Sequence, residues 1–238
     1  MNEISLMRWG TRALLASALL LAVCAALVWV AQRPQFDLQR IEVNGSLRHV
    51  SRTAIRAAIA GRLQGTFFTM SLAQTRAAFE SIPWVAAASV RRVWPDRLVV
   101  TLVERHAVGL WNDGRVVADD GALFDVNPAE AELDGPLVDF SGPPQMAGEA
   151  VARLHSFDAL LASLPASVAA IDISERASWT IRTNGGQTLE LGRDVPLGSV
   201  PARLAAIVTN YPTVVAQLSG NPARIDARYN NGFAATRP

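Results

Sequence analysis

The chain has 238 residues, of which 50% are hydrophobic, so it is long enough and apolar enough to bury a substantial core. Its 22 basic residues nearly balance its 21 acidic residues, and no run of like charge is longer than two residues, which excludes the basic footprint of a nucleic-acid-binding protein. The only cysteine is Cys24, which excludes an intrachain disulfide.

The first element is an apolar segment, Ala13 to Ala31, with 19 residues and no charge. As a helix it would be about 28 Å long, which is enough to cross the hydrocarbon core of a bilayer. We interpret it as an uncleaved membrane anchor after a tail of residues 1–12. Two alternatives stay open: a cleaved signal peptide, and a lipoprotein signal at Cys24, where the bulky Val23 precedes the cysteine. Similar numbers of arginines lie on both sides of the segment, so they do not indicate which side of a membrane the rest of the chain would face.

The next stretch predicts a strand, two helices and a β-hairpin. Phe36 to Asn44 has the apolar pattern of a strand, and Ser51 and Ser71 are typical helix N-caps. Ile82 to Arg105 is typical of a hairpin, with a turn at Trp94-Pro95 and a return strand rich in β-branched residues. This order predicts a compact three-stranded sheet with two helices on one face.

From residue 105 onward, turn sequences such as Asn112-Asp113-Gly114 separate short apolar strands. Helices are predicted over Glu149 to Leu164 and from Val200 onward, where Pro212 breaks or kinks the second one. The predicted strands cover residues 108–111, 116–118, 123–124, 137–140, 171–173, 179–183, 188–191 and 223–229. This half of the chain is therefore expected to form a second, sheet-rich domain.

Residues that could carry catalysis or hold a metal are scattered. His49, His106 and His155 have no second ligand at metal spacing, and Cys24 lies inside the apolar segment. The sequence contains no motif for a serine nucleophile, a zinc protease or a nucleotide-binding loop. We therefore predict no catalytic residue, no cofactor and no metal, and expect that the protein is not an enzyme.

Six tryptophans in a chain with only two tyrosines could indicate an interface. However, Trp84, Trp94, Trp111 and Trp179 lie on predicted strands or turns beside apolar neighbours. We therefore expect most of them to lie in the hydrophobic core.

The last predicted strand has an alternating pattern from Ile225 to Tyr229. A last strand is commonly an edge strand, whose unpaired backbone groups can pair with a strand from a partner. Tyr229 and Phe233 would then be apolar anchors, and Arg176 or Arg228 could pair with an acidic residue. The alternative is that this strand only completes the sheet, and the residues alone leave both interpretations open.

Several motifs occur in a characteristic order. In the first half they are Phe36, Leu38, Ile41, Val43 and Gly45, then Gly65, Phe67 and Phe68, then Pro83, Trp84, Val85, Ala88, Val90, Arg91, Arg92, Trp94, Pro95, Leu98, Val100 and Glu104. In the second half they include Asp120-Gly121, Leu191-Gly192, Arg203-Leu204, Tyr211-Pro212 and Gly232-Phe233. This order resembles the FtsQ/DivIB family of bacterial division proteins.

The resemblance implies an α+β fold in four parts. These are a cytoplasmic tail of residues 1–12, a single N-terminal transmembrane helix over 13–31, a POTRA domain of order β-α-α-β-β over 36–104, and a mixed, sheet-rich β domain with flanking helices over 105–235. The last part would contain a C-terminal partner-binding strand. The protein would cross the bacterial inner membrane once, with its bulk in the periplasm, and would concentrate at the division septum.

The resemblance also implies a function. The chain would be a non-enzymatic scaffold of the divisome, linking early and late division proteins. Its β domain would bind FtsB- and FtsL-like partners through Arg176, Arg228, Tyr229, Asn231, Gly232 and Phe233. Its POTRA domain would recruit FtsK-like and other divisome proteins, with Ser51 to Arg62 and the hairpin as candidate surfaces.

Two other classes of protein fit the sequence less well. A POTRA-containing secretion or outer-membrane assembly factor would need further POTRA copies or barrel strands of about ten residues, which residues 105–238 do not provide. A membrane-anchored cell-wall hydrolase would need a catalytic constellation, which the sequence lacks. The division scaffold is the function that the sequence supports best.

Overall fold

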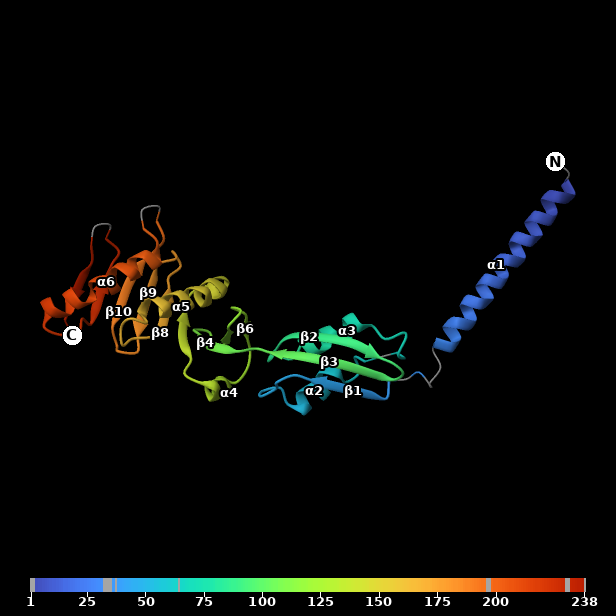
Figure 1. The fold of residues 1–238 in the computed structure, drawn as a ribbon, viewed down its shortest axis with the longest axis horizontal. Helices are drawn as coiled ribbons and strands as arrows, with labels where there is room; N and C mark the ends of the chain where they lie inside the picture. The colour runs from blue at the N-terminus through green and yellow to red at the C-terminus, as the bar shows by residue number, and fades with distance from the viewer. Residues whose placement is uncertain are drawn as a thin grey trace. The chain divides into compact units, whose positions relative to one another are not determined.

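The structure is a computed structural model that describes residues 3–31, 36, 38–63, 65–195, 198–229 and 232–237. The chain divides into two compact units, Met1–Glu104 and Arg105–Pro238 (Figure 1). Each unit combines helices with its own β-sheet, so the predicted α+β class is confirmed. Figure 1 gives the helix and strand labels used below.

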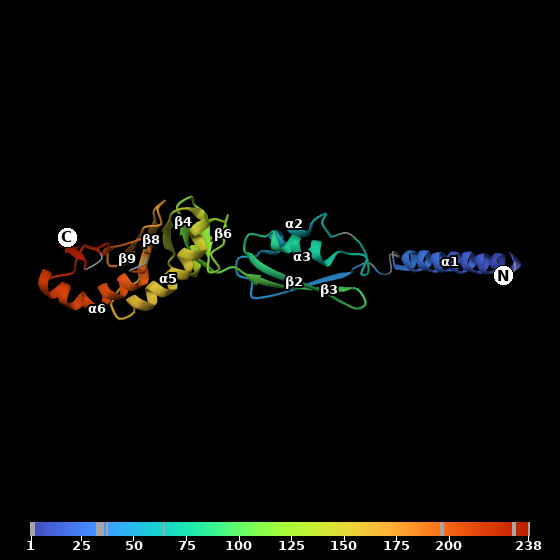
Figure 2. The same ribbon diagram turned by 90° about the horizontal axis from the view of Figure 1, so that it is seen from above.

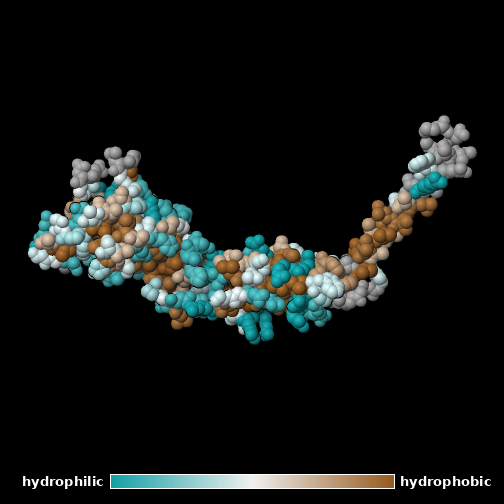
Figure 3. All heavy atoms as spheres, in the orientation of Figure 1, coloured by the Kyte–Doolittle hydropathy of each residue, from teal (hydrophilic) through white to brown (hydrophobic). Residues whose placement is uncertain are grey.

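Helix α1, Glu3–Ala31, contains the charge-free segment noted in the sequence. Its described apolar side chains are exposed, as shown by Leu14 at 72% and Leu27 at 64%, and they colour this helix brown in Figure 3. Within the described residues, however, no helix combines the length and the hydropathy that a membrane crossing requires. The transmembrane helix therefore stays a prediction.

The first unit contains a three-stranded sheet in the order β1-β3-β2. Strand β1, Arg40–Asn44, is parallel to β3, Arg97–Glu104, and β2, Val85–Val93, is antiparallel to β3. Strand β1 begins four residues later than Phe36, where the sequence predicted the strand to start. The hairpin formed by β2 and β3 is the longest paired segment of this unit.

Helices α2, Arg52–Ile59, and α3, Leu72–Glu80, cover one face of this sheet (Figure 2). The hydroxyls of Ser51 and Ser71 each accept a backbone N–H three residues further on, so both predicted N-caps are confirmed. Phe79 of α3 is fully buried, whereas α2 contains no buried residue. The apolar residues Ile55 and Ile59 of α2 are only half-buried, because α3 packs on β2 and α2 packs mainly on α3.

The second unit contains a nine-stranded sheet in the order β12-β11-β10-β9-β8-β7-β4-β5-β6. The strands are β4 Ala107–Trp111, β5 Val116–Ala118, β6 Leu123–Phe124, β7 Val138–Ser141, β8 Val168–Ile173, β9 Trp179–Thr183, β10 Thr188–Gly192, β11 Arg224–Asp226 and β12 Ala234–Thr236. Its helices are α4 Pro128–Ala131, α5 Ala147–Leu161 and α6 Val200–Leu218, with short 3₁₀ turns at Glu132–Asp134 and Pro144–Met146. Pro212 lies inside α6, which continues past it.

Helices α5 and α6 lie on one face of the nine-stranded sheet, and the hydrophobic core fills the space between them (Figure 2). Phe157 of α5 and Leu204 of α6 are fully buried there, together with Ile225 of β11. The core thus reaches along the sheet as far as β11, and it supports the strand next to the C-terminal edge.

The tryptophans divide into two groups. Among the four tryptophans outside α1, Trp84, Trp111 and Trp179 are at most 4% exposed, which confirms the expectation that most of these four lie in the core. Trp94 is the exception, because it is 73% exposed in the turn between β2 and β3. Most of its large apolar surface is therefore not packed within its own chain, so this position is not explained by packing.

The end of the chain differs from the prediction. The strand predicted over residues 223–229 is β11, which covers only Arg224–Asp226 and pairs with β10 on one side and β12 on the other. The outermost strand is β12, Ala234–Thr236, so the prediction that residues 223–229 form the edge is wrong. Three residues are too few to produce a detectable alternation of apolar and polar side chains.

Candidate functional site

The candidate site begins with the edge strand β12. Its residues Ala234, Ala235 and Thr236 pair with Asp226, Ile225 and Arg224 of β11 in antiparallel register. Within the described residues, β12 has no strand on its other side. An edge strand of this kind offers backbone N–H and C=O groups to a strand from another chain.

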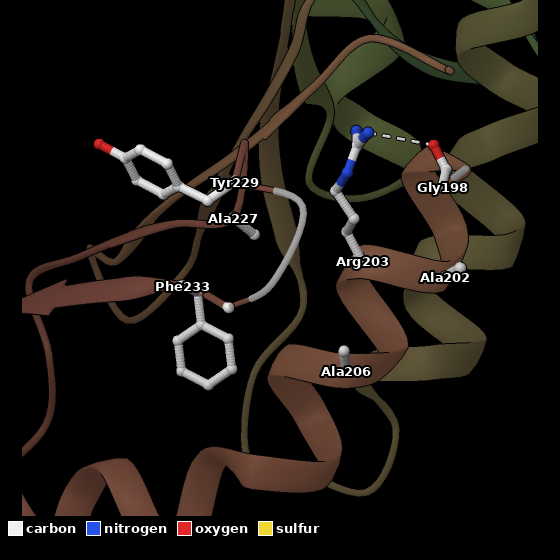
Figure 4. Close-up of a pocket in the computed structure, with 8 residues that line it drawn as sticks. Gly198, Ala202, Arg203, Ala206, Ala227, Tyr229 and Phe233 are labelled. Atoms are coloured by element: carbon white, nitrogen blue, oxygen red, sulfur yellow. Dashed lines mark hydrogen bonds between the residues drawn. The ribbon is translucent and has the colours of Figure 1, made fainter. Parts of the chain in front are cut away.

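A pocket of about 200 Å³ lies beside this edge, between α6 and the connection from β11 to β12 (Figure 4). We call it the apolar pocket; it is lined by Gly198, Ala202, Arg203, Ala206, Ala227, Tyr229, Gly232 and Phe233. Ala202 and Ala206 project from α6, and Tyr229 and Phe233 stand at the two ends of the connection (Figure 4). The ring of Tyr229 is 63% exposed, so it is available as an anchor for a partner.

A second pocket of about 420 Å³ contains four arginines and no acidic residue. We call it the basic pocket; it is lined by Arg176, Ser178, Gly192, Arg193, Val195, Arg203 and Arg228. Arg203 lines both pockets, and its guanidinium donates hydrogen bonds to the carbonyl oxygens of Leu191 at 2.6 Å and Gly198 at 3.1 Å. It therefore acts as a fixed wall between the two pockets.

Arg228 is held by acidic neighbours within its own chain. Its Nη2 lies 2.6 Å from Oδ2 of Asp226 and 3.1 Å from Oε2 of Glu190. The hydrogen bond from Arg228 lowers the pKa of Asp226 below its ordinary value, although partial burial opposes this. Among the described residues, Arg176 and Arg193 form no ion pair, so they are the arginines best placed to meet an acidic partner.

The structure brings five of the six predicted site residues to these two pockets. Tyr229, Gly232 and Phe233 line the apolar pocket, and Arg176 and Arg228 line the basic pocket. The sixth residue, Asn231, lies outside the described residues. The grouping joins the turn between β8 and β9 to the connection between β11 and β12, which are far apart in the sequence.

Several residues of this site were not predicted from the sequence. Arg193 and the α6 residues Ala202, Arg203 and Ala206 line the pockets but were not predicted as site residues. The pair Arg203-Leu204 was noticed only as part of the family motif order. Its partners are carbonyl groups on a preceding loop and strand, so no local pattern could have indicated its role as a pocket wall.

Within the part of the chain that the structure describes, no candidate metal site competes with this edge. The described residues contain no group of three or more His, Cys, Asp or Glu side chains that could hold a metal ion. His49 instead stacks on Trp84, with ring centroids 4.0 Å apart, and its Nδ1 lies 3.8 Å from Glu104. This histidine therefore has a packing role at the end of β3.

Comparisons with known proteins identify the family. Residues 36–105 match the family model for the POTRA domain, FtsQ-type, and residues 109–228 match the model for the C-terminal domain of the cell division protein FtsQ/DivIB. The chain belongs to the FtsQ/DivIB family. This confirms the resemblance seen in the motif order.

Individual relatives agree with the family models. The chain is 39% identical to the cell division protein FtsQ of Burkholderia pseudomallei, over 98% of this chain and 92% of that protein. It is 37% identical to FtsQ of Bordetella pertussis, over 94% of this chain and 88% of that protein. It is 30% identical to FtsQ of Thiomonas arsenitoxydans, over 98% and 86%. The similarity therefore covers nearly the whole length of both proteins in each pair.

The FtsQ/DivIB family is a family of non-enzymatic cell division proteins, and its members act with other proteins of the divisome. The predicted role in division and the prediction that the chain is not an enzyme are confirmed by this membership. The C-terminal match ends at Arg228, so Tyr229, Phe233 and strand β12 lie beyond the part of the chain that the family model covers.

Proposed function

We propose that this chain is a scaffold of the divisome that binds an FtsB- and FtsL-like partner through its C-terminal sheet edge. The observation that carries the proposal is the open edge of β12, with the apolar pocket next to the connection that leads into it and the basic pocket near the ends of β9 and β10. A partner strand pairs with β12 through backbone hydrogen bonds. An apolar side chain of the partner packs on Tyr229 and Phe233, and an acidic side chain pairs with Arg176.

The proposal includes a membrane anchor. Residues 13–31 are free of charge and lie within α1, whose described leucines are exposed. In this arrangement residues 1–12 are cytoplasmic, and the POTRA domain over 36–104 and the β domain over 105–235 are periplasmic. The anchor keeps the protein in the inner membrane at the septum. Confining both partners to one membrane layer raises their effective concentration.

The POTRA domain has the second role, which is to recruit FtsK-like and other division proteins. The candidate surfaces are Ser51 to Arg62 and the hairpin. Support comes from α2, none of whose side chains is buried, and from a pocket of about 450 Å³ lined by Gly61, Arg62, Gln74, Ala77 and Ala78. These surfaces belong to the first unit, whereas the sheet edge proposed for the FtsB-like partner belongs to the second unit.

The test measures binding of the soluble part of an FtsB-like partner to the full chain in lipid nanodiscs. Replacing both Tyr229 and Phe233 with Ala removes the two aromatic anchors, and we expect affinity to fall at least about tenfold. Leu133→Ala is the matched control, because Leu133 is 82% exposed in the same unit and lines neither pocket. Circular dichroism checks that each variant keeps its fold.

Arg176→Glu tests the basic pocket separately. We expect weaker binding that an acid-to-base exchange in the partner restores, because the two charges are then reversed together. The matched control is Arg182→Glu, since Arg182 is an exposed arginine of β9 outside the pocket. Unchanged affinity in both the double alanine variant and Arg176→Glu would refute this edge as the binding site.

A further inference from the structure

An exposed aromatic cluster lies at one end of the first unit, away from the sites described above. We call it the aromatic tip and define it as Phe36, Phe68 and Trp94. Trp94 is 73% exposed and Phe68 is 50% exposed, while Phe36 is partly buried. The rings of Phe36 and Phe68 meet edge to face, with centroids 5.2 Å apart. Exposed apolar side chains that gather at one place are a candidate interaction site.

Two backbone hydrogen bonds and one hydrogen bond from a side chain gather these residues from separate parts of the chain. The N–H of Phe67 donates to the carbonyl of Phe36 at 2.7 Å, and the N–H of Gln39 donates to the carbonyl of Asp96 at 3.0 Å. The guanidinium of Arg92 donates to the carbonyl of Met70. The segment that enters β1, the loop before α3 and the turn between β2 and β3 are thereby held at the same end of the unit (Figure 1).

The chain length limits where this tip can lie. Only residues 32–35 separate the end of α1 from Phe36, so the five Cα–Cα steps from Ala31 to Phe36 span at most about 17 Å. The opposite end of the sheet, at Glu104, instead leads into the second unit. If α1 is the membrane anchor, the aromatic tip is therefore the end of the POTRA domain that is tethered beside the bilayer.

The composition of the tip suits a lipid headgroup layer. Tryptophan is enriched at this level of a membrane, because its ring is apolar and its N–H remains a hydrogen-bond donor. Arg40 and Arg97 lie opposite each other in the register of β1 and β3 at the same end of the sheet. Glu42 lies 3.9 Å from Arg97, and Asp96 is in the turn, so both signs are present. The exposed Arg40 can meet lipid phosphate groups.

We propose that the aromatic tip is a membrane contact, in which Trp94 and Phe68 enter the headgroup layer and hold the POTRA domain against the outer surface of the bilayer that anchors it. This rests on the proposed membrane anchor. Contact at two points, α1 and the tip, restricts the rotation of the POTRA domain about its short tether. A function follows for Trp94, which packing within the chain does not explain.

The test uses tryptophan fluorescence of the full chain in vesicles of phosphatidylethanolamine and phosphatidylglycerol, with bromines placed near the top or near the end of the acyl chains. In a Trp9→Phe, Trp29→Phe background, Trp94 is the remaining exposed tryptophan, because Trp84, Trp111 and Trp179 are at most 4% exposed. We expect a loss of emission with shallow bromines and a smaller loss with deep bromines. Trp94→Phe in the same background removes the quenching.

A companion variant separates the tip from the anchor. It carries Trp9→Phe and Trp94→Phe and keeps Trp29, which lies in α1, so its quenching reports the anchor alone. Quenching of Trp29 without quenching of Trp94 overturns the tip proposal and leaves the anchor intact. Absence of quenching at both positions overturns both. Protection of Trp94 only after a division partner is added also overturns the proposal, because the tip is then a protein-binding surface.

Discussion

The outermost strands β2 and β12 differ in whether a side chain of the same chain bonds to their free edge. At β2, the Glu80 carboxylate of α3 accepts the N–H of Ala88 at 3.2 Å, and Arg76 holds this carboxylate at 2.7 Å. A side chain of the POTRA unit thus occupies one of the edge donors of β2. At β12, no side chain of the described residues bonds to the strand, which is only three residues long and follows the connection that lines the apolar pocket.

This difference distinguishes a protected edge from an available one. An unoccupied edge strand promotes unwanted pairing between chains, and a charged side chain on the edge is a common means of prevention. The fold uses this means at β2, whose nine residues would otherwise be a long template. At β12 the pairing surface is short, so side-chain anchors must supply selectivity, which is consistent with the proposed role of Tyr229 and Phe233.

The largest effect is expected from Ile225→Ala. Ile225 is fully buried in β11, which is the only described neighbour of β12, so the substitution should lower the free energy of unfolding by about 2–5 kcal/mol. Partner binding should weaken as the edge loosens. Chemical denaturation and a binding assay measure the two effects.

The control is Val103→Ala, because Val103 is 56% exposed on β3. We expect it to change the free energy of unfolding by no more than about 0.5 kcal/mol. If Ile225→Ala lowered stability but left affinity for the partner unchanged, the prediction that partner binding depends on the buried core beneath β11 would be wrong.

A smaller effect is expected at the protected edge. Glu80→Ala leaves the N–H of Ala88 without its acceptor and should cost about 1–3 kcal/mol. Glu80→Gln keeps an oxygen at this place and should cost less. Denaturation measures the stability, and sedimentation measures whether the alanine variant self-associates through β2. Equal losses in the two variants would show that Glu80 acts through its charge and not as an acceptor for the edge.

Local signals predicted the POTRA unit well. The N-caps Ser51 and Ser71 and the hairpin follow from side-chain types at fixed spacing, which depend on contacts near in sequence. The sequence could not show that Trp94 is exposed and Trp84 is buried. Each of them has a proline on one side and a valine on the other. Their exposure is decided by the position of each in the tertiary fold.

The candidate site was predictable only in part. Arg176, Arg228 and Tyr229 were predicted from the pattern of the last predicted strand and from the resemblance to a family, and their role in binding stays a prediction. Strand β12 was not predicted, because its three small residues show no periodicity. Its position also depends on pairing with β11 across a connecting loop. The wall formed by Arg203 depends on carbonyl groups that only the folded chain brings within reach.

The smallest expected effect is the loss of folding stability at acidic pH. The hydrogen bond from Arg76 and that from the Ala88 N–H lower the pKa of Glu80 below its ordinary value of about 4.5. The unfolded chain therefore binds the proton more readily, so this contribution to stability is complete above the ordinary pKa and is lost as pH falls through the lowered value. We expect the stability difference between the wild type and Glu80→Gln to be constant near neutral pH and to shrink below about pH 4.5.

Asp226 offers the matching measurement at the other edge, because Arg228 lowers its pKa in the same direction. Amide exchange at Ala88 reports the POTRA edge, and exchange at Ile225 reports the C-terminal edge, each as a protection factor corrected for pH. Acid should reduce protection at Ala88 less in Glu80→Gln than in the wild type, and at Ile225 less in Asp226→Asn. The opposite result, in which acid reduces protection more in the variant than in the wild type at either amide, would mean that the carboxylate there does not stabilise its edge in the ionised form.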